Sequence, residues 1–226
     1  MIMKKAKYAC VMFDLDGTLL DTIEDITNAV NLTLCEFSYP KRSVSEVKTY
    51  INNGARRLIY LALPEDERND ENVSRVLGRY LEVYADHVCE KTRLYGKIPE
   101  LIKKLKNDGI KLAVVSNKPE ILVKKLLDLC FGKGVFDYSS GTGENLPRKP
   151  DKVCVDLALE ALGVQKESVL FVGDSSVDVL TAENSGLHCV GVTWGFGGEK
   201  SFEEFAPDEK AKSAKELEKI IYGKEQ

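Results

Sequence analysis

Short apolar runs alternate with helical patterns along most of this chain. The strand-like runs are rich in Val, Leu and Phe and cover residues 8–13, 111–115, 135–139, 168–172 and 188–194. Strands that are buried on both faces of a parallel sheet have such near-continuous apolar sequences. Helical patterns, several of which start at proline or stop at glycine, occupy residues 99–107, 119–130, 151–162, 176–185 and 213–222. This alternation predicts βαβ units and therefore a parallel sheet.

Residues 22–91 break this alternation. Apolar residues recur there at helical spacing, first over residues 23–37 and again over residues 73–84. Between these two stretches, Ser43 and Glu46 have the spacing of a capping box, which begins a helix. Apolar stripes of this kind normally pack against other helices. We therefore expect a helical module that is inserted after the first strand, before the α/β pattern resumes.

Composition narrows the class of protein. The chain has 226 residues, of which 43% are hydrophobic, enough for one good-sized domain or a domain with a small partner. The formal net charge of -4 disfavours nucleic acid as the main partner. No apolar run reaches the ~18 residues of a membrane span, so we expect neither a membrane partner nor secretion. The six cysteines are scattered, which suits free thiols in a reducing cytosol. We expect a cytoplasmic protein, monomeric by default, with a dimer as the alternative.

Chemically active residue types gather where strands end, beginning with Asp14 and Asp16. These two carboxylates follow the first apolar run, and Gly17 stands directly behind them. In a strand, residues i and i+2 point the same way, so both acids would face one site if the chain stays extended through Asp16. Two acids on one face repel each other unless a cation or a shared proton separates them. The pair therefore predicts a metal site, acid/base chemistry, or both.

Three further polar motifs accompany the later strands. They are Ser116-Asn117 after the second strand, Lys149 before a helix, and Asp174 with Asp178 after the fourth strand. Together with the stretch Asp14-Leu15-Asp16-Gly17-Thr18, their order and contexts resemble the four motifs of the haloacid dehalogenase-like superfamily of phosphohydrolases. The resemblance covers nearly the whole chain. Within the superfamily the chain most resembles the phosphoglycolate phosphatase group, in residues 13–22, 53–55 and 191–197.

The resemblance implies a fold and a domain organisation. The fold is a Rossmann-like three-layer α/β/α core with a parallel five-stranded sheet of order 3-2-1-4-5, plus an inserted α-helical cap domain. Residues 1–17 and 92–226 would form the core domain, and residues 18–91 would form the cap. In this order the first strand lies between the second and the fourth, so the motifs converge at the carboxyl ends of the strands.

The resemblance also implies an activity and a role for each motif residue. The enzyme would be a Mg²⁺-dependent phosphatase that hydrolyses a small phosphate monoester, with 2-phosphoglycolate as the first guess, through an aspartyl-phosphate intermediate. Asp14 would be the nucleophile, Asp16 the proton donor and acceptor, and Lys149 the neutralising cation. Mg²⁺ prefers hard oxygen ligands, and its ligands would come from Asp14, the backbone carbonyl of Asp16, and Asp174, with Asp178 in support. The phosphate would be held by Ser116, Asn117, Gly17 and Thr18.

Some of these residues have plainer alternatives. Thr18 could form only a turn or cap bond, and Asp178 could be an acid that stabilises the first turn of a helix. In the cap, Arg56 could bind a remote carboxylate of the substrate, because Arg grips carboxylates bidentately. Equally, Arg56 could be an exposed helix residue.

The function has alternatives too. A phosphomutase of the β-phosphoglucomutase type shares the core and the cap class, but it needs a stable phospho-aspartate and sugar contacts in the cap. Pyrophosphatase and 5′-nucleotidase activities stay open, because core motifs fix the reaction while cap residues fix the leaving group. A catalytically inactive binding protein on the same fold is the alternative from a different class. Such a protein would normally lack the nucleophile or the acid, and this chain has both Asp14 and Asp16.

Overall fold

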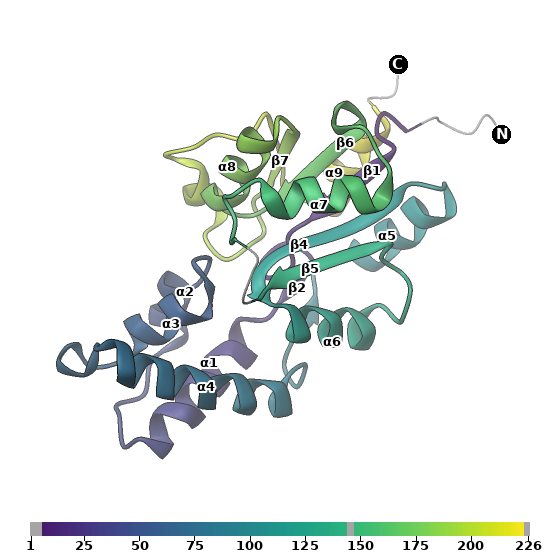
Figure 1. Cartoon of the computed structure of the whole chain (residues 1–226). Coiled ribbons are helices and arrows are strands. Elements are labelled where there is room, and N and C mark those ends of the chain that lie inside the picture. Colours follow the sequence, from purple (N-terminus) through teal and green to yellow (C-terminus); the bar gives the residue numbers. More distant parts are fainter. Residues whose placement is uncertain (1–5, 144–146, 224–226) are drawn as a thin grey trace.

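The computed structural model describes residues 6–143 and 147–223. Its main sheet has six parallel strands in the order β5-β4-β1-β6-β7-β8 (Figure 1). The strands are β1 (Cys10–Phe13), β4 (Lys111–Pro119), β5 (Tyr138–Thr142), β6 (Val169–Gly173), β7 (His188–Val192) and β8 (Glu209–Ala211). The predicted parallel sheet and its order 3-2-1-4-5 are confirmed. β8 was not expected, because its three residues, Glu-Lys-Ala, carry no apolar run.

The third predicted strand lies three residues later than expected. β5 pairs Tyr138 with Ala113 and Ser139 with Val114, whereas the apolar residues before it stay outside the sheet. One of them, Phe136, packs edge-on against Phe131, with 5.2 Å between ring centroids. The apolar run therefore marked a packed turn before the strand, and the strand itself is the polar sequence Tyr-Ser-Ser-Gly-Thr.

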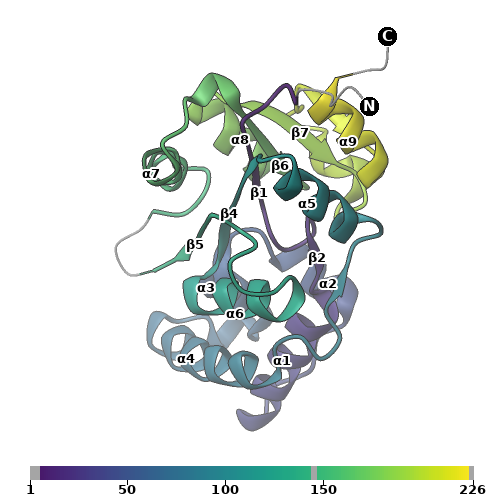
Figure 2. The ribbon, with the colours of Figure 1, turned by 90° about the vertical axis from the view of Figure 1, so that its right-hand side faces the viewer.

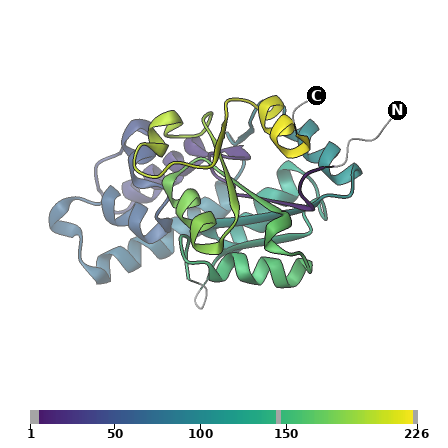
Figure 3. The same cartoon turned by 90° about the horizontal axis from the view of Figure 1, so that it is seen from above.

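Helices cover both faces of the sheet and make three layers (Figures 2 and 3). Alternate residues of the strands point to opposite faces. Val11 and Phe13 of β1 join an apolar cluster with α5 (Ile98–Asn107), α6 (Glu120–Cys130) and α9 (Ala214–Tyr222). Cys10 and Met12 of the same strand join a second cluster with α7 (Val153–Leu162) and α8 (Ser176–Ser185). All four β1 residues are fully buried, as a sheet covered on both faces requires.

The expected helical module follows β1. It comprises α1 (Ile23–Glu36), α2 (Val44–Tyr50), α3 (Gly54–Ala62) and α4 (Asp70–His87), which pack on one another at one end of the sheet (Figure 1). The predicted capping box is present, with the Ser43 hydroxyl and the Glu46 carboxylate each accepting from the other's backbone N–H. Where the chain enters and leaves the module, β2 (Leu20–Asp21) and β3 (Arg93–Leu94) pair antiparallel.

The described residues also include three short 3₁₀ helices: Glu65–Glu67, Lys166–Ser168 and Gly198–Phe202. Within residues 6–143 and 147–223, none of the helices combines the length and the apolar character that crossing a membrane requires.

Candidate active site

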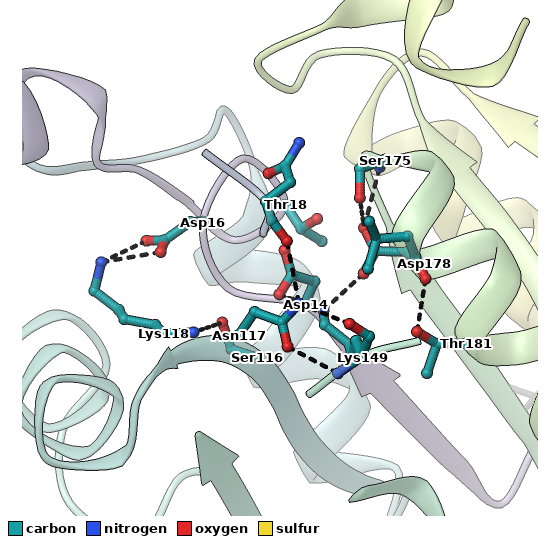
Figure 4. A network of polar contacts seen from close by, with 12 residues as sticks. Asp14, Asp16, Thr18, Ser116, Asn117, Lys118, Lys149, Ser175, Asp178 and Thr181 are labelled. Atoms are coloured by element: carbon teal, nitrogen blue, oxygen red, sulfur yellow. Dashed lines mark hydrogen bonds and ion pairs between the residues drawn. The ribbon is translucent and has the colours of Figure 1, made fainter. Parts of the chain in front are cut away.

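The loop after β1 presents the first acid pair. Asp14 directly follows the strand, and its backbone N–H donates to the carbonyl of Val172 on β6 at 2.9 Å. The chain then turns sharply, because the carbonyl of Leu15 accepts three backbone N–H groups and Gly17 has a φ of +88°. The two acids are therefore not on one continuous strand. Both line the same pocket, but the Asp16 carboxylate is turned away from Asp14 (Figure 4).

A buried lysine joins two of the acids. Lys149 Nζ donates to Asp14 Oδ1 and to Asp178 Oδ1, each at 2.7 Å, and its side chain is 3% exposed. Burial alone would lower the pKa of Lys149, but the two carboxylates outweigh burial and raise it, so the ammonium stays charged. Burial also raises the pKa of Asp14, to about 6, even though Lys149 acts in the opposite direction.

Asp174 lies beside this pair without a cation of its own. It accepts hydrogen bonds from the Thr18 hydroxyl at 3.3 Å and from the backbone N–H of Phe196 at 3.0 Å. In the described part of the chain, no ammonium or guanidinium group lies within ion-pair distance of it. Burial, then the charges of Asp178 and Asp14, raise the pKa of Asp174 well above its usual value.

This acid cluster suits a hard cation. One carboxylate oxygen from each of Asp14, Asp174 and Asp178 lies within 4.8 Å of the others, and all three residues are buried. A single lysine cannot offset three buried charges. Burial raises the pKa values of Asp14 and Asp174, and the neighbouring carboxylates raise them further. Carboxylate oxygens are the ligands that Mg²⁺ and Ca²⁺ prefer. The backbone also makes room for Asp174, since a Cβ at Gly17 or Gly195 would lie 2.3 Å from its carboxylate.

Ser116 and Asn117 lie near the carboxyl end of β4, which continues to Pro119 rather than ending at residue 115. Both residues line the pocket. The Asn117 side chain holds the loop around Lys149 in place. Its Oδ1 accepts from the backbone N–H of Lys149 at 2.8 Å, and its Nδ2 donates to the Lys149 carbonyl at 3.1 Å. Nδ2 also donates to the carbonyl of Asn52 in the helical module at 3.1 Å. The Asn117 side chain thus positions the loop that carries Lys149.

The other predicted site residues lie as follows. Thr18 faces Asp174, so it does more than close a turn. Asp178 has both of the contacts considered for it, because Oδ1 accepts from Lys149 while Oδ2 accepts the N–H and the hydroxyl of Ser175 at the start of α8. Arg56 lies outside the pocket: it donates to Asp70 at 2.7 Å and to Ser74 at 2.9 Å.

The arrangement has a counterpart among known proteins. A family model described as haloacid dehalogenase-like hydrolase matches residues 11–192, which include every motif residue named above. The chain belongs to the haloacid dehalogenase-like hydrolase family. This result confirms the resemblance that the sequence motifs suggested, together with the fold class.

Individual proteins that the chain resembles carry the same assignment. The chain is 37% identical over 203 residues to phosphoglycolate phosphatase 1 of Pseudomonas aeruginosa, with 87% of this chain and 74% of that protein covered. It is 36% identical over 190 residues to a phosphoglycolate phosphatase of Aquifex aeolicus, with 82% and 85% covered. A crystal structure of a predicted phosphoglycolate phosphatase from Haemophilus somnus superposes with a TM-score of 0.85 at 28% identity, and covers 95% of this chain and 98% of its own. This hydrolase is accordingly a phosphatase, as predicted.

One residue of the hydrolase site had no predicted role. Lys118, at the end of β4, is 3% exposed and donates to both oxygens of Asp16, at 2.9 and 3.1 Å. It also donates to the Tyr84 hydroxyl on α4 at 2.8 Å. Asp16 accepts a further hydrogen bond from Thr22, the residue before α1, at 2.7 Å. The available signal was the position of Lys118 directly after Ser116-Asn117, at the edge where the motifs meet.

Proposed function

We propose that this phosphatase hydrolyses a small phosphate monoester by Mg²⁺-dependent covalent catalysis on Asp14, with 2-phosphoglycolate as its substrate. The observation that carries the proposal is the position of Asp14. Its carboxylate lies in a pocket of about 60 Å³, bound to a buried lysine, with Ser116 and Asn117 on the same wall. Such a carboxylate is positioned as a nucleophile, with cationic and hydrogen-bonding groups beside it for the phosphate oxygens.

In the first half of the reaction, an Oδ atom of Asp14 attacks phosphorus. A P–O bond to Asp14 forms, and the P–O bond to the leaving group breaks. The carboxyl group of Asp16 gives its proton to the leaving oxygen and becomes a carboxylate. Because the Asp16 carboxylate is paired with Lys118 in the structure, it has to leave the lysine, take up a proton and turn toward Asp14 before this step.

In the second half, water attacks the phosphorus of the aspartyl-phosphate. The Asp16 carboxylate takes a proton from this water as the new P–O bond forms. The P–O bond to Asp14 breaks and inorganic phosphate leaves. Asp14 is again a carboxylate and Asp16 again holds a proton, so the cycle closes with one ester and one water consumed.

Cations have to offset the repulsion between Asp14 and an incoming phosphate dianion. Lys149 supplies one positive charge at Asp14 Oδ1, and the Ser116 hydroxyl supplies a neutral donor. Asp14, Asp174 and the backbone carbonyl of Asp16 would hold Mg²⁺, with Asp178 supporting them through Lys149. When bound, the ion supplies charge stabilisation for the phosphoryl oxygens.

The helical module is proposed to be a cap domain that comprises residues 18–91, with residues 1–17 and 92–226 as the core. Support comes from β2 and β3, which bring the two connections side by side, and from the pocket, which Ile26, Leu58 and Tyr80 of the module also line. Apolar cap side chains above the acids would exclude water during phosphoryl transfer, and opening of the cap would release the product.

The test is phosphate release from a panel of 2-phosphoglycolate, pyrophosphate, β-glucose 1-phosphate and nucleoside monophosphates, with Mg²⁺ or with EDTA. We expect one strong preference, for 2-phosphoglycolate, that EDTA abolishes. Asp14→Asn serves as the matched inactive control. Release from another ester would move the substrate assignment, and release from none would contradict the proposal.

A further inference from the structure

We infer that Lys118 binds the carboxylate of the substrate's leaving group, and that this carboxylate takes the place of Asp16 on the lysine. The inference rests on the proposed function and specifies how the leaving group is chosen. It assigns a recognition role to a residue that the reaction itself does not require.

The first observation is that Lys118 is a buried ammonium facing the pocket. Its partners are the Asp16 carboxylate, at 2.9 Å, and the Tyr84 hydroxyl, at 2.8 Å. The ammonium also lies 4.5 Å from the centroid of the Tyr84 ring. A buried ammonium has to be paired, since an unpaired charge in such surroundings is costly.

The second observation is that Lys149, the other cation in the described lining of this pocket, is already paired with two acids. Of the residues that line this pocket in the described part of the chain, only Lys118 and Lys149 are cationic. Lys149 is shared between Asp14 and Asp178, beside the proposed phosphate position. A second anionic group on the substrate therefore has one ammonium to bind, which is Lys118 once Asp16 has turned away.

The arginines that could bind the substrate carboxylate instead lie outside this pocket. Arg56, Arg57 and Arg148 line a separate cavity of about 930 Å³, on the other side of Asn117 and Lys149. There Arg56 is paired with Asp70, and Arg57 stacks on the Tyr60 ring at 4.9 Å. A leaving group attached to a phosphate on Asp14 lies in the pocket of Lys118, so we assign the carboxylate to that lysine.

Proton donation by Asp16 then becomes linked to its pairing with Lys118. When Asp16 turns to protonate the leaving oxygen, Lys118 keeps only the Tyr84 hydroxyl and loses its anionic partner. A leaving group that carries a carboxylate restores the ion pair, whereas a neutral leaving group leaves the ammonium unpaired. The charge-assisted contact should favour the acidic leaving group by about 10- to 100-fold in kcat/KM.

The test compares 2-phosphoglycolate with ethyl phosphate, which has the same carbon skeleton without the carboxylate. We expect wild type to prefer 2-phosphoglycolate, and Lys118→Met to reduce the ratio of the two kcat/KM values by about 10- to 100-fold. The ratio cancels any general loss caused by a misplaced Asp16. Lys124→Met, an exposed lysine of α6 paired with Glu120, is the matched control and should keep the wild-type ratio.

Two results would overturn the assignment: an unchanged ratio in Lys118→Met, or a ratio that falls in Arg56→Met instead. Failure of the proposed function is recognised separately, because wild type would then release phosphate from neither ester.

Direct binding gives a second measurement that does not depend on the folding of Lys118→Met. Asp16→Asn frees Lys118 from its anionic partner. In calorimetry, the ratio of the affinities for 2-phosphoglycolate and ethyl phosphate should therefore be higher in Asp16→Asn than in Asp14→Asn. Equal ratios in these two variants would also contradict the inference.

Discussion

Replacing Lys149 by methionine should destabilise the protein strongly, because it leaves two buried carboxylates without their cation. The side chains of Asp178 and Asp14 are only 1% and 10% exposed, and each accepts from Lys149 at 2.7 Å. Removal of one partner from a buried ion pair costs about 3–5 kcal/mol. For a chain of this length that corresponds to a fall in Tm of roughly 6–20 °C. At pH 5 the loss should be smaller, since Asp14, with a pKa of about 6, then takes up a proton.

The assay is urea and thermal unfolding in EDTA, so that metal binding does not mask the loss. Lys152→Met is the matched control, because Lys152 is 60% exposed and its pair with Asp156 spans 3.4 Å. Exposed pairs of this kind contribute ~0–1 kcal/mol. The double variant Lys149→Met/Asp178→Asn should recover part of the stability, because it removes one of the unpaired charges. A loss no larger than that of Lys152→Met, or a double variant no more stable than the single, would refute the reasoning.

Three further predictions concern the acids and the glycine beside them. Asp14→Asn should abolish turnover and Asp16→Asn should lower it by about 10²- to 10⁴-fold, with circular dichroism unchanged; substantial phosphate release by Asp14→Asn would exclude it as the nucleophile. Gly17→Ala places a Cβ 2.3 Å from the Asp174 carboxylate at a φ of +88°. The variant should lose about 1–3 kcal/mol of unfolding free energy and should be activated less strongly by Mg²⁺. If its Mg²⁺ titration matched that of wild type, this would argue against the cluster as the metal site. Because the folded-state pKa of Asp14 is raised from 3.8 to about 6, its stabilising contribution is fully present below about pH 4 and is lost as pH rises through 6. In EDTA, the unfolding free energy of wild type should therefore rise relative to that of Asp14→Asn as pH falls from 7 to 4.5, by up to roughly 2–3 kcal/mol. A difference in unfolding free energy that does not change with pH would show that Asp14 is not buried as described.

The sequence predicted the sheet well because its strands are buried on both faces. A strand such as Cys10–Phe13 has no solvent-facing positions, so its apolar run coincides with the element. The prediction was less accurate at the sheet's edges, where β5 is polar and β8 has only three residues. Strand order came from the family resemblance rather than from the pattern, since periodicity within a strand carries no information about its neighbours.

The positions of the site residues were predictable, but the directions of their side chains were not. The motifs fixed which residues reach the carboxyl ends of β1, β4 and β6, and the structure brings Asp14, Ser116 and Lys149 into one pocket. The direction of the Asp16 carboxylate depends on Lys118, 102 residues away in the chain. A lysine beside a motif is ordinarily expected at the surface, whereas this one is 3% exposed and is held by Asp16 and by the Tyr84 hydroxyl of α4.

Lys118 also changes the charge balance of the site. When ionised, the four acids Asp14, Asp16, Asp174 and Asp178 carry four negative charges, and the sequence assigned only Lys149 against them, which leaves three. With Lys118 included, two negative charges remain, and one divalent cation at the acid cluster would neutralise them before a phosphate dianion enters. In the proposed reaction, a carboxylate on the leaving group would take the place of Asp16 at Lys118, so the lysine would exchange one anionic partner for another. On this proposal, each of the two lysines in the pocket would offset the charge at one anionic end of a short substrate.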